Sequence, residues 1–296
     1  MKILISGASG LIGSRLSQYL HAQGHHVLPL YRGRNTTAKN YWLPEKNIIR
    51  LDENVKFDAV IHLAGENIAD GRWSTKRKAA ILESRVNGTR LIAKAVASLQ
   101  HKPSVFISAS AIGFYGDTGE HLVDEETDRG TGFLSEIATQ WEEATQQVEK
   151  SGVRTVHLRT GIVLSPKGGV LKKMLIPFKM GLGGVVGNGK QYMSWISIDD
   201  VVAIIETFLR NQDCSGAYNL VAPQTVTNDT FTKTLGKALH RPTFIPMPAF
   251  IARLAFGEMA DALLLSSCRV DAMRLSKLGY SFIDTQLESA LNRLLK

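Results

Sequence analysis

Cysteine is scarce in this sequence: its 296 residues include only Cys214 and Cys268, which lie far apart. Two distant cysteines supply neither a disulfide framework nor a zinc site, and they suit a reducing cytoplasm. Runs of about 20 apolar residues, the length that crosses a bilayer as a helix, are also missing. An apolar strand pattern starts at Ile3, which leaves no room for a secretory signal peptide. We therefore expect a cytoplasmic protein with no metal site and no membrane partner.

The charged residues are not balanced: 35 Lys and Arg stand against 27 Asp and Glu, which gives a net charge of +8 at pH 7. A basic surface is one property of nucleic-acid-binding proteins. Here the basic residues are scattered along the chain, and an anionic cofactor would account for some of them. We therefore expect no nucleic-acid partner, whose binding would weaken steeply with salt.

The most informative stretch is residues 2–13, where a short apolar run is followed by glycines at a G-x-x-G-x-x-G spacing. The run indicates a buried parallel strand, and an amphipathic helix follows. Gly7 permits the tight turn, Gly10 lets the backbone approach a ligand, and Gly13 lets the helix pack against the strand. The open amides of the first helical turn favour a pyrophosphate, although the turn could also be purely structural. The predicted dinucleotide contacts are Gly7, Ser9, Gly10, Leu11, Ile12 and Gly13.

The second expected strand, residues 26–31, ends in Tyr31 and Arg32, where a dinucleotide fold meets the adenosine ribose. An acidic residue there binds the 2′-hydroxyl of NAD, whereas arginine accommodates the 2′-phosphate of NADP. The strand end carries Arg32 and Arg34 and no acid, so we predict NADP(H). One charge-assisted contact to phosphate contributes on the order of 1.5–3 kcal/mol, or about ten- to a hundred-fold in affinity. The alternative is that both arginines belong to a solvated turn.

The rest of the first half alternates between apolar runs and helical patterns, which predicts an α/β fold with a Rossmann-like, doubly wound parallel sheet. Further strands are expected at residues 48–51, 58–65, 105–110 and 155–158, and helices at residues 75–99 and 134–151. Ligands of such sheets bind at the carboxyl ends of the strands. Cofactor contacts are therefore expected there, at Leu63, Ala64, Gly65, Ser108, Ala109 and Arg159. His62, within an apolar run, is interpreted as a packed core histidine.

The alternation breaks after Leu164, where glycine-rich segments begin. We expect residues 1–165 to form an NADP-binding Rossmann domain, to which residues 190–225 return. Residues 166–296 are expected to form a smaller, mixed α/β substrate-binding lobe. A helix is expected from about residue 198 to Arg210, with Asp199 or Asp200 as its cap.

These segments resemble the extended short-chain dehydrogenases/reductases of the nucleotide-sugar epimerase type. More narrowly, they resemble the atypical branch called the epimerase family (YfcH type), which has a small C-terminal extension, here residues 241–291. The resemblance implies NADP(H) binding and places Arg85 on a helix position that faces the active site. One departure is Ser267-Cys268, where the branch usually has Gly-Gln. The matching segments are residues 7–13, 62–67, 72–73, 78–85, 88–89, 108–116 and 195–200.

A second departure concerns chemistry. Catalytic relatives use Tyr-x-x-x-Lys, in which the lysine lowers the pKa of the tyrosine so that it exchanges a proton with the substrate. None of the seven tyrosines here has lysine four residues later, and the window 131–138 holds neither residue. Candidate replacements are Tyr115, Ser110 and Glu66, with Arg85 and Arg159 as cofactor or substrate contacts or as buried structural pairs.

Two functions therefore stay open. The first is an NADP(H)-dependent oxidoreductase or epimerase that acts on a small polar substrate. The second is a non-catalytic NADPH sensor or scaffold. In either case we expect a monomer or a homodimer.

Overall fold

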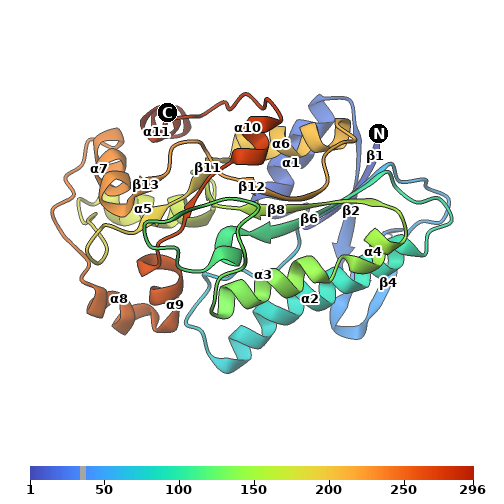
Figure 1. The fold of residues 1–296 in the computed structure, drawn as a ribbon, viewed down its shortest axis with the longest axis horizontal. Helices are drawn as coiled ribbons and strands as arrows, with labels where there is room; N and C mark the ends of the chain where they lie inside the picture. Colours follow the sequence, from blue (N-terminus) through green and yellow to red (C-terminus); the bar gives the residue numbers. More distant parts are fainter. Residues whose placement is uncertain (34–37) are drawn as a thin grey trace.

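A single sheet of eight strands forms the centre of the computed structural model, which describes residues 1–33 and 38–296 (Figure 1). The strands lie in the order β12-β8-β6-β5-β1-β2-β3-β4. Neighbours run parallel except for the edge pair β3 and β4. This is the Rossmann-like sheet that the sequence predicts. The strands are β1 (Lys2–Ser6), β2 (His26–Arg32), β3 (Tyr41–Leu43), β4 (Ile48–Arg50), β5 (Ala59–His62), β6 (Val105–Ala111), β8 (Arg154–Thr160) and β12 (Gly216–Leu220).

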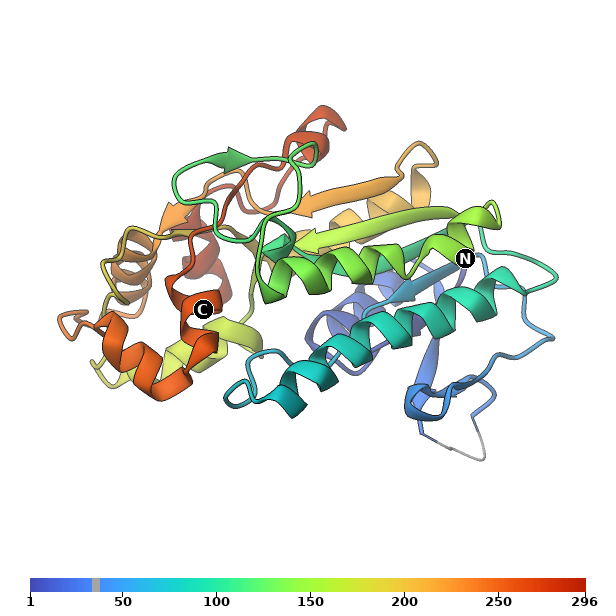
Figure 2. The same ribbon diagram turned by 60° about the horizontal axis from the view of Figure 1, so that its bottom comes forward.

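Helices cover both faces of the sheet (Figures 1 and 2). One face carries α1 (Leu11–Ala22), α6 (Ile198–Arg210) and α10 (Met273–Lys277); the other carries α2 (Thr75–Ala97), α3 (Phe133–Glu143) and α4 (Gln146–Lys150). Side chains alternate along a strand, so Ile3 and Ile5 of β1 pack with α1 and α6, whereas Leu4 packs with α2 and α4. Burial on both faces explains why β1 is a continuous apolar run.

The two outermost strands of the sheet, on the side of β2, differ from the prediction. Residues 48–51 do contain a strand, β4, but it is antiparallel and lies at the outer edge. The place next to β2 belongs to β3, a three-residue strand that runs parallel to it. Three residues before Pro44 are too few to show a periodic pattern, so the sequence carried no signal for β3.

Two helix details also differ from the prediction. The helix expected at residues 134–151 is divided into α3 and α4, with Ala144 and Thr145 between them. The cap of α6 is Ser197 rather than an aspartate: its hydroxyl accepts the backbone N–H of Asp200 at 3.1 Å and donates to the Asp200 carboxylate at 2.8 Å. Serine is a good cap because its short side chain reaches the open amides of the first turn.

Part of the C-terminal half gathers at one end of the sheet, where α5 (Gly169–Lys179), α7 (Asn228–Ala238), α8 (Ala249–Phe256) and α9 (Glu258–Ala260) lie together (Figure 1). Its core includes Trp195, Phe231 and Leu291. Across the described residues, no helix is long and apolar enough to span a membrane. The remaining elements are η1 (Pro44–Lys46), η2 (Ile112–Tyr115), β7 (Leu122–Val123), β9 (Ile162–Leu164), β10 (Tyr192–Met193), β11 (Trp195–Ser197), β13 (Val226–Thr227), η3 (Asp261–Leu265), β14 (Arg269–Val270) and α11 (Leu287–Leu294).

Candidate functional site

The glycine turn between β1 and α1 contains two closely packed glycines and one open glycine. A Cβ atom on Gly13 would lie 2.1 Å from the carbonyl oxygen of Gly7, and one on Gly7 would lie 2.8 Å from the amide nitrogen of Ala64. Gly7 also has a φ of +71°, a backbone angle that residues with a side chain rarely adopt. A Cβ on Gly10 would meet only the Gly7 oxygen, at 3.3 Å. The turn therefore presents bare backbone at Gly10, where a ligand can approach.

Gly10 is also the N-cap of α1, and no side chain of the described residues caps this helix. The amides of its first turn keep their partial positive charge free for an anion. This arrangement fits a dinucleotide pyrophosphate.

The carboxyl ends of β1, β5 and β6 meet beside this turn. Ser6, His62 and Ser108 lie side by side in the sheet register. The predicted residues Leu63, Ala64 and Gly65 follow β5 at this edge, and Ser108 and Ala109 lie within β6. The structure thus brings five predicted cofactor contacts to the edge that carries the glycine turn.

His62 is fully buried, and burial lowers its pKa to about 3, so its ring is neutral. Its Nδ1 atom lies 2.6 Å from the Ser6 hydroxyl, which also accepts the backbone N–H of Leu63. The edge of the Trp42 ring packs against it, with 5.7 Å between the ring centroids. These contacts agree with the interpretation of His62 as a core residue that links β1 to β5.

At the end of β2, Tyr31 and Arg32 are both exposed. Arg32 Nη1 lies 3.4 Å from Oε1 of Glu66, and the second oxygen of that carboxylate lies 3.2 Å from Arg77 Nη1. Two guanidinium groups therefore share one carboxylate at the place where an adenosine 2′-phosphate is expected. Arg34, the second basic residue of the prediction, lies outside the described residues.

Arg85 of α2 is partly buried at the same edge. A Cβ on Gly65 would lie 3.6 Å from its Cζ atom, and its guanidinium stacks over the Trp141 ring at 5.0 Å. Burial lowers the pKa of Arg85 to about 10, so the group is still charged at neutral pH.

Arg159 lies in a buried polar cluster at the ends of β6 and β8. Its Nε and Nη2 atoms each donate to one carboxylate oxygen of Glu142, both at 2.9 Å. Its Cζ atom lies 3.5 Å over the Phe114 ring. Burial raises the pKa of Glu142, but the Arg159 guanidinium outweighs burial and holds that pKa below its usual value. The pair is therefore ionised and bidentate.

Ser110 and Tyr115 belong to the same cluster. The Ser110 hydroxyl donates to Glu142 at 2.7 Å, and the Tyr115 hydroxyl donates to Asn219 at 2.8 Å while it accepts from Arg159 at 3.0 Å. Tyr115 is only 3% exposed, and burial raises its pKa to about 12 although Arg159 acts in the opposite direction. Catalytic roles for the two hydroxyls stay predictions; in this structure both groups bond to protein partners.

Sequence reasoning missed three residues of this region: Glu142, Trp141 and Asn219. Glu142 carried a weak signal, since it lies one turn after Ala138 and next to Trp141 on the inward face of α3. Asn219 carried none, because it is 104 residues from its partner Tyr115.

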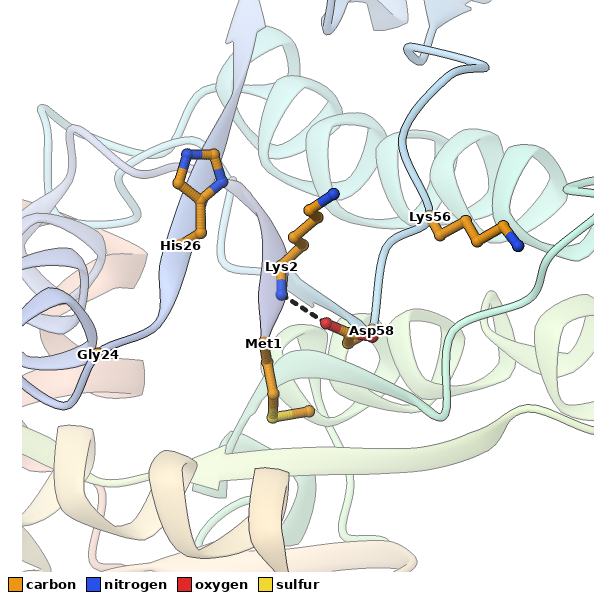
Figure 3. Close-up of a pocket in the computed structure, with 6 residues that line it drawn as sticks. All are labelled: Met1, Lys2, Gly24, His26, Lys56 and Asp58. Atoms are coloured by element: carbon orange, nitrogen blue, oxygen red, sulfur yellow. Dashed lines mark hydrogen bonds between the residues drawn. The ribbon is translucent and has the colours of Figure 1, made fainter.

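The hollow in Figure 3 lies at the opposite edge of the sheet. Lys2, His26 and Asp58 stand at the starts of β1, β2 and β5, and the Lys2 amide donates to the Asp58 carboxylate at 2.6 Å. The hollow measures about 400 Å³. Because ligands of parallel sheets bind at the carboxyl ends of the strands, we assign it no cofactor role.

The sheet order and the glycine turn define an α/β protein of the Rossmann class, of the short-chain dehydrogenase/reductase type. The chain belongs to the NAD dependent epimerase/dehydratase family, whose model matches residues 3–220. A second family, described as a domain of unknown function (DUF1731), matches residues 247–294. The resemblance to the epimerase family that the sequence motifs indicated is confirmed.

Relatives match the chain over almost its whole length. Epimerase family protein Mb2239 of Mycobacterium bovis is 40% identical over 290 residues, which cover 98% of this chain and 96% of that protein. The crystal structure of human epimerase family protein SDR39U1 (isoform2) with NADPH has a TM-score of 0.90 at 32% identity and covers 99% of each chain. NADPH in that structure agrees with the cofactor predicted from Arg32. UDP-glucose 4-epimerase of Thermotoga maritima, at 18% identity and a TM-score of 0.76 over 100% of this chain and 98% of its own, shows the fold alone.

Proposed function

We propose that this chain binds NADP(H) at the carboxyl edge of its sheet and acts as an oxidoreductase or epimerase on a small polar substrate. The observation that carries the proposal is the glycine turn, in which backbone is bare at Gly10 and the first-turn amides of α1 are uncapped. Arg32 at the end of β2 supports the phosphorylated form of the cofactor. The NADPH bound to human SDR39U1 supports it further.

The proposed contacts follow from their position at this edge. The glycine turn would hold the pyrophosphate, and the ends of β2, β5 and β6 would hold the two nucleosides. The residues are Gly7, Ser9, Gly10, Leu11, Ile12, Gly13, Tyr31, Arg32, Leu63, Ala64, Gly65, Ser108, Ala109 and Arg159. For Arg85, which the sequence predicted as a cofactor or a substrate contact, we propose the substrate, as argued in the next subsection.

Bound NADPH would donate a hydride to a substrate carbonyl, and bound NADP⁺ would accept one from a substrate alcohol. The chain then has to add a proton to the substrate oxygen in the first case and remove one in the second. Our candidates are Tyr115, Ser110 and Glu66. Glu66 is the most exposed of the three, with about a third of its side chain accessible, whereas the two hydroxyls are buried. An acid–base group in this position contributes about 10²–10⁴-fold to the rate.

The alternative is an NADPH sensor or scaffold without turnover. One observation favours it: Tyr115 and Ser110, the candidate hydroxyls, both donate their protons to side chains within the cluster of Arg159 and Glu142. A hydroxyl already committed to protein acceptors is a poorer proton donor to a substrate.

The test begins with calorimetric titration of the purified chain with NADPH and NADH. We expect NADPH to bind about ten- to a hundred-fold more tightly. Equal binding, or none, would remove the cofactor assignment. Oxidation of NADPH is then followed with a panel of small carbonyl compounds, and light scattering measures whether the complex is a monomer or a homodimer. Tight binding without any turnover would favour the sensor.

A further inference from the structure

Arg85 differs from Arg32, Arg77 and Arg159 at the carboxyl edge because, among the described residues, it forms no ion pair, although the more distant charge of Glu66 still favours its charged form. Arg159 pairs with Glu142, while Arg32 and Arg77 share Glu66. In the part of the chain that the structure describes, no carboxylate oxygen lies within 4.0 Å of Arg85. A partly buried guanidinium loses hydration, so its charge normally calls for an acceptor.

Backbone carbonyls do not take the place of that acceptor. Arg154 and Arg274 also have no carboxylate partner in the described residues, but each donates to two carbonyl oxygens at 2.6–3.0 Å. Arg85 donates to only one, that of Ile81, at 3.3 Å. Most of its N–H groups therefore remain without a protein acceptor in the described structure.

Trp141 supplies a second, independent sign of a missing acceptor. Its ring lies 5.0 Å from the Arg85 guanidinium, its side chain is 6% exposed, and its indole N–H is buried with no acceptor among the described residues. A buried indole N–H usually has a hydrogen-bond partner. Neighbouring side chains on α2 and α3 therefore both have N–H groups without an acceptor in the described structure, and an oxyanion is the kind of group that supplies acceptors.

Arg85 belongs to α2, a different element from the glycine turn and from β2, to which the phosphates of the cofactor are assigned. The pyrophosphate is accounted for by the glycine turn, and the 2′-phosphate by Arg32. Arg85 lies against Gly65, which follows β5, and stacks on α3. Once both phosphate positions are assigned, the Arg85 guanidinium has no anionic part of the cofactor left to bind.

We propose that Arg85, stacked on Trp141, binds an oxyanion of the substrate, either a carboxylate or a phosphate, beside the bound cofactor. The proposal rests on the function proposed above and specifies its substrate class. A planar guanidinium suits both groups because two of its N–H bonds match two oxygens. The local charge supports it as well, because Glu66 pairs with both Arg32 and Arg77. This one carboxylate, which also acts on Arg85 from a distance, does not balance three positive charges. The substrate is then an acid or a phosphate ester that carries its reactive hydroxyl or carbonyl close to the anion.

The test uses the NADPH-loaded protein with sodium oxalate or inorganic phosphate as the probe, at constant ionic strength, and follows thermal denaturation. We expect saturable protection of the parent protein. In Arg85→Met the affinity for the protecting anion should fall about ten- to a hundred-fold, the size of one charge-assisted contact. Arg85→Lys keeps the positive charge and should retain part of the affinity for the anion. It replaces Arg85→Met in the test if the methionine variant does not fold. If oxalate protects better than phosphate, the anionic group of the substrate is a carboxylate. If phosphate protects better than oxalate, the substrate is a phosphate ester.

The matched control is Arg90→Met on the same helix, an exposed arginine whose one side-chain hydrogen bond among the described residues is to Asn87. The anion should protect Arg90→Met against thermal denaturation as well as it protects the parent protein. Titration with NADPH separates this proposal from the proposed function. Unchanged NADPH affinity in Arg85→Met together with lost anion protection supports an anionic substrate site. A fall of about tenfold or more in NADPH affinity would make Arg85 a cofactor residue and overturn the proposal while the cofactor assignment stands. Equal protection of parent and variant, or no saturable protection of the parent, overturns it too.

Discussion

The side chain of Arg32 is 62% exposed, and its pair with Glu66, at 3.4 Å, is one that solvent screens strongly. A phosphate group could therefore displace Glu66 at little cost. We predict that Arg32→Asp shifts the ratio of NADPH to NADH dissociation constants toward NADH by about ten- to a hundred-fold, because a carboxylate then faces the 2′-phosphate. Calorimetric titration with both cofactors measures the ratio.

Arg50→Asp is the control for Arg32→Asp, since Arg50 is an exposed arginine on the neighbouring edge strand β4. Arg50→Asp changes the net charge by the same amount as Arg32→Asp, and it should leave the ratio of the NADPH and NADH dissociation constants unaltered. If Arg32→Asp keeps the parent ratio, another residue binds the phosphate, and Arg34 is the next to test.

The hydroxyl of Tyr115 joins Arg159 of β8 to Asn219 of β12. In Tyr115→Phe, the Nη1 group of Arg159 and the Oδ1 atom of Asn219 lose this contact inside the protein. We predict that the free energy of unfolding falls by about 1–3 kcal/mol, measured by urea denaturation. Tyr41→Phe is the control, because the Tyr41 hydroxyl makes no hydrogen bond within the described structure.

The same Tyr115→Phe protein tests catalysis once a substrate is known. A fall in turnover of about 10²–10⁴-fold would identify Tyr115 as an acid–base group. Turnover within about threefold of the parent would leave it a purely structural residue of the Arg159 cluster.

At the scale of elements, the junction of β1 and α1 separates cofactor binding from folding. Among the described residues, the Gly7 oxygen, at 3.3 Å, is the one atom within 4 Å of a Cβ on Gly10, so the space beside it is open where we propose that the pyrophosphate binds. We predict that Gly10→Val folds but loses NADPH affinity by about tenfold or more, equal to about 1.4 kcal/mol. Calorimetric titration measures the affinity, and circular dichroism checks the fold.

Gly13→Ala is the contrasting variant, because its Cβ would lie 2.1 Å from the Gly7 oxygen. It should lower the melting temperature even without cofactor, since α1 has to move away from the turn. An unchanged dissociation constant in Gly10→Val would mean that the dinucleotide does not lie on this turn.

Across the whole molecule, the regions matched by the two family models are joined through Asp200. This fully buried carboxylate on α6 accepts the Tyr280 hydroxyl at 3.0 Å and the backbone N–H groups of Ile283 and Asp284 at 2.8 and 3.1 Å. We predict that Asp200→Ala lowers the free energy of unfolding by about 2–4 kcal/mol, because these three donors and the Ser197 hydroxyl all lose their acceptor. Hydrogen exchange at residues 283 and 284 should also become faster.

Asp213→Ala, at an exposed position after α6, is the control for charge and should stay within about 0.5 kcal/mol of the parent. If Asp200→Ala is equally neutral, the C-terminal segment is held by its apolar contacts and Asp200 does not stabilise the junction.

The sequence by itself determined the features of this protein that depend on residues close together in the chain. The glycine spacing at 7, 10 and 13 predicted the turn, because φ angles and close backbone contact are local properties. Apolar runs predicted the buried strands, and the α/β alternation predicted their parallel order. The family resemblance rested on the same short segments. All of this follows from chain geometry within a few residues.

Tertiary structure alone decided which side chains meet. Glu142 holds Arg159 and Ser110, and Asn219 holds Tyr115, although these residues come from α3, β8, β6, η2 and β12. Likewise, β3 rather than β4 takes the place beside β2, since pairing between short strands depends on the whole sheet. The Arg85 guanidinium belongs to this class as well, because its lack of an ion pair among the described residues depends on every segment that packs around it. Such contacts depend on packing among distant segments, which local sequence patterns do not encode.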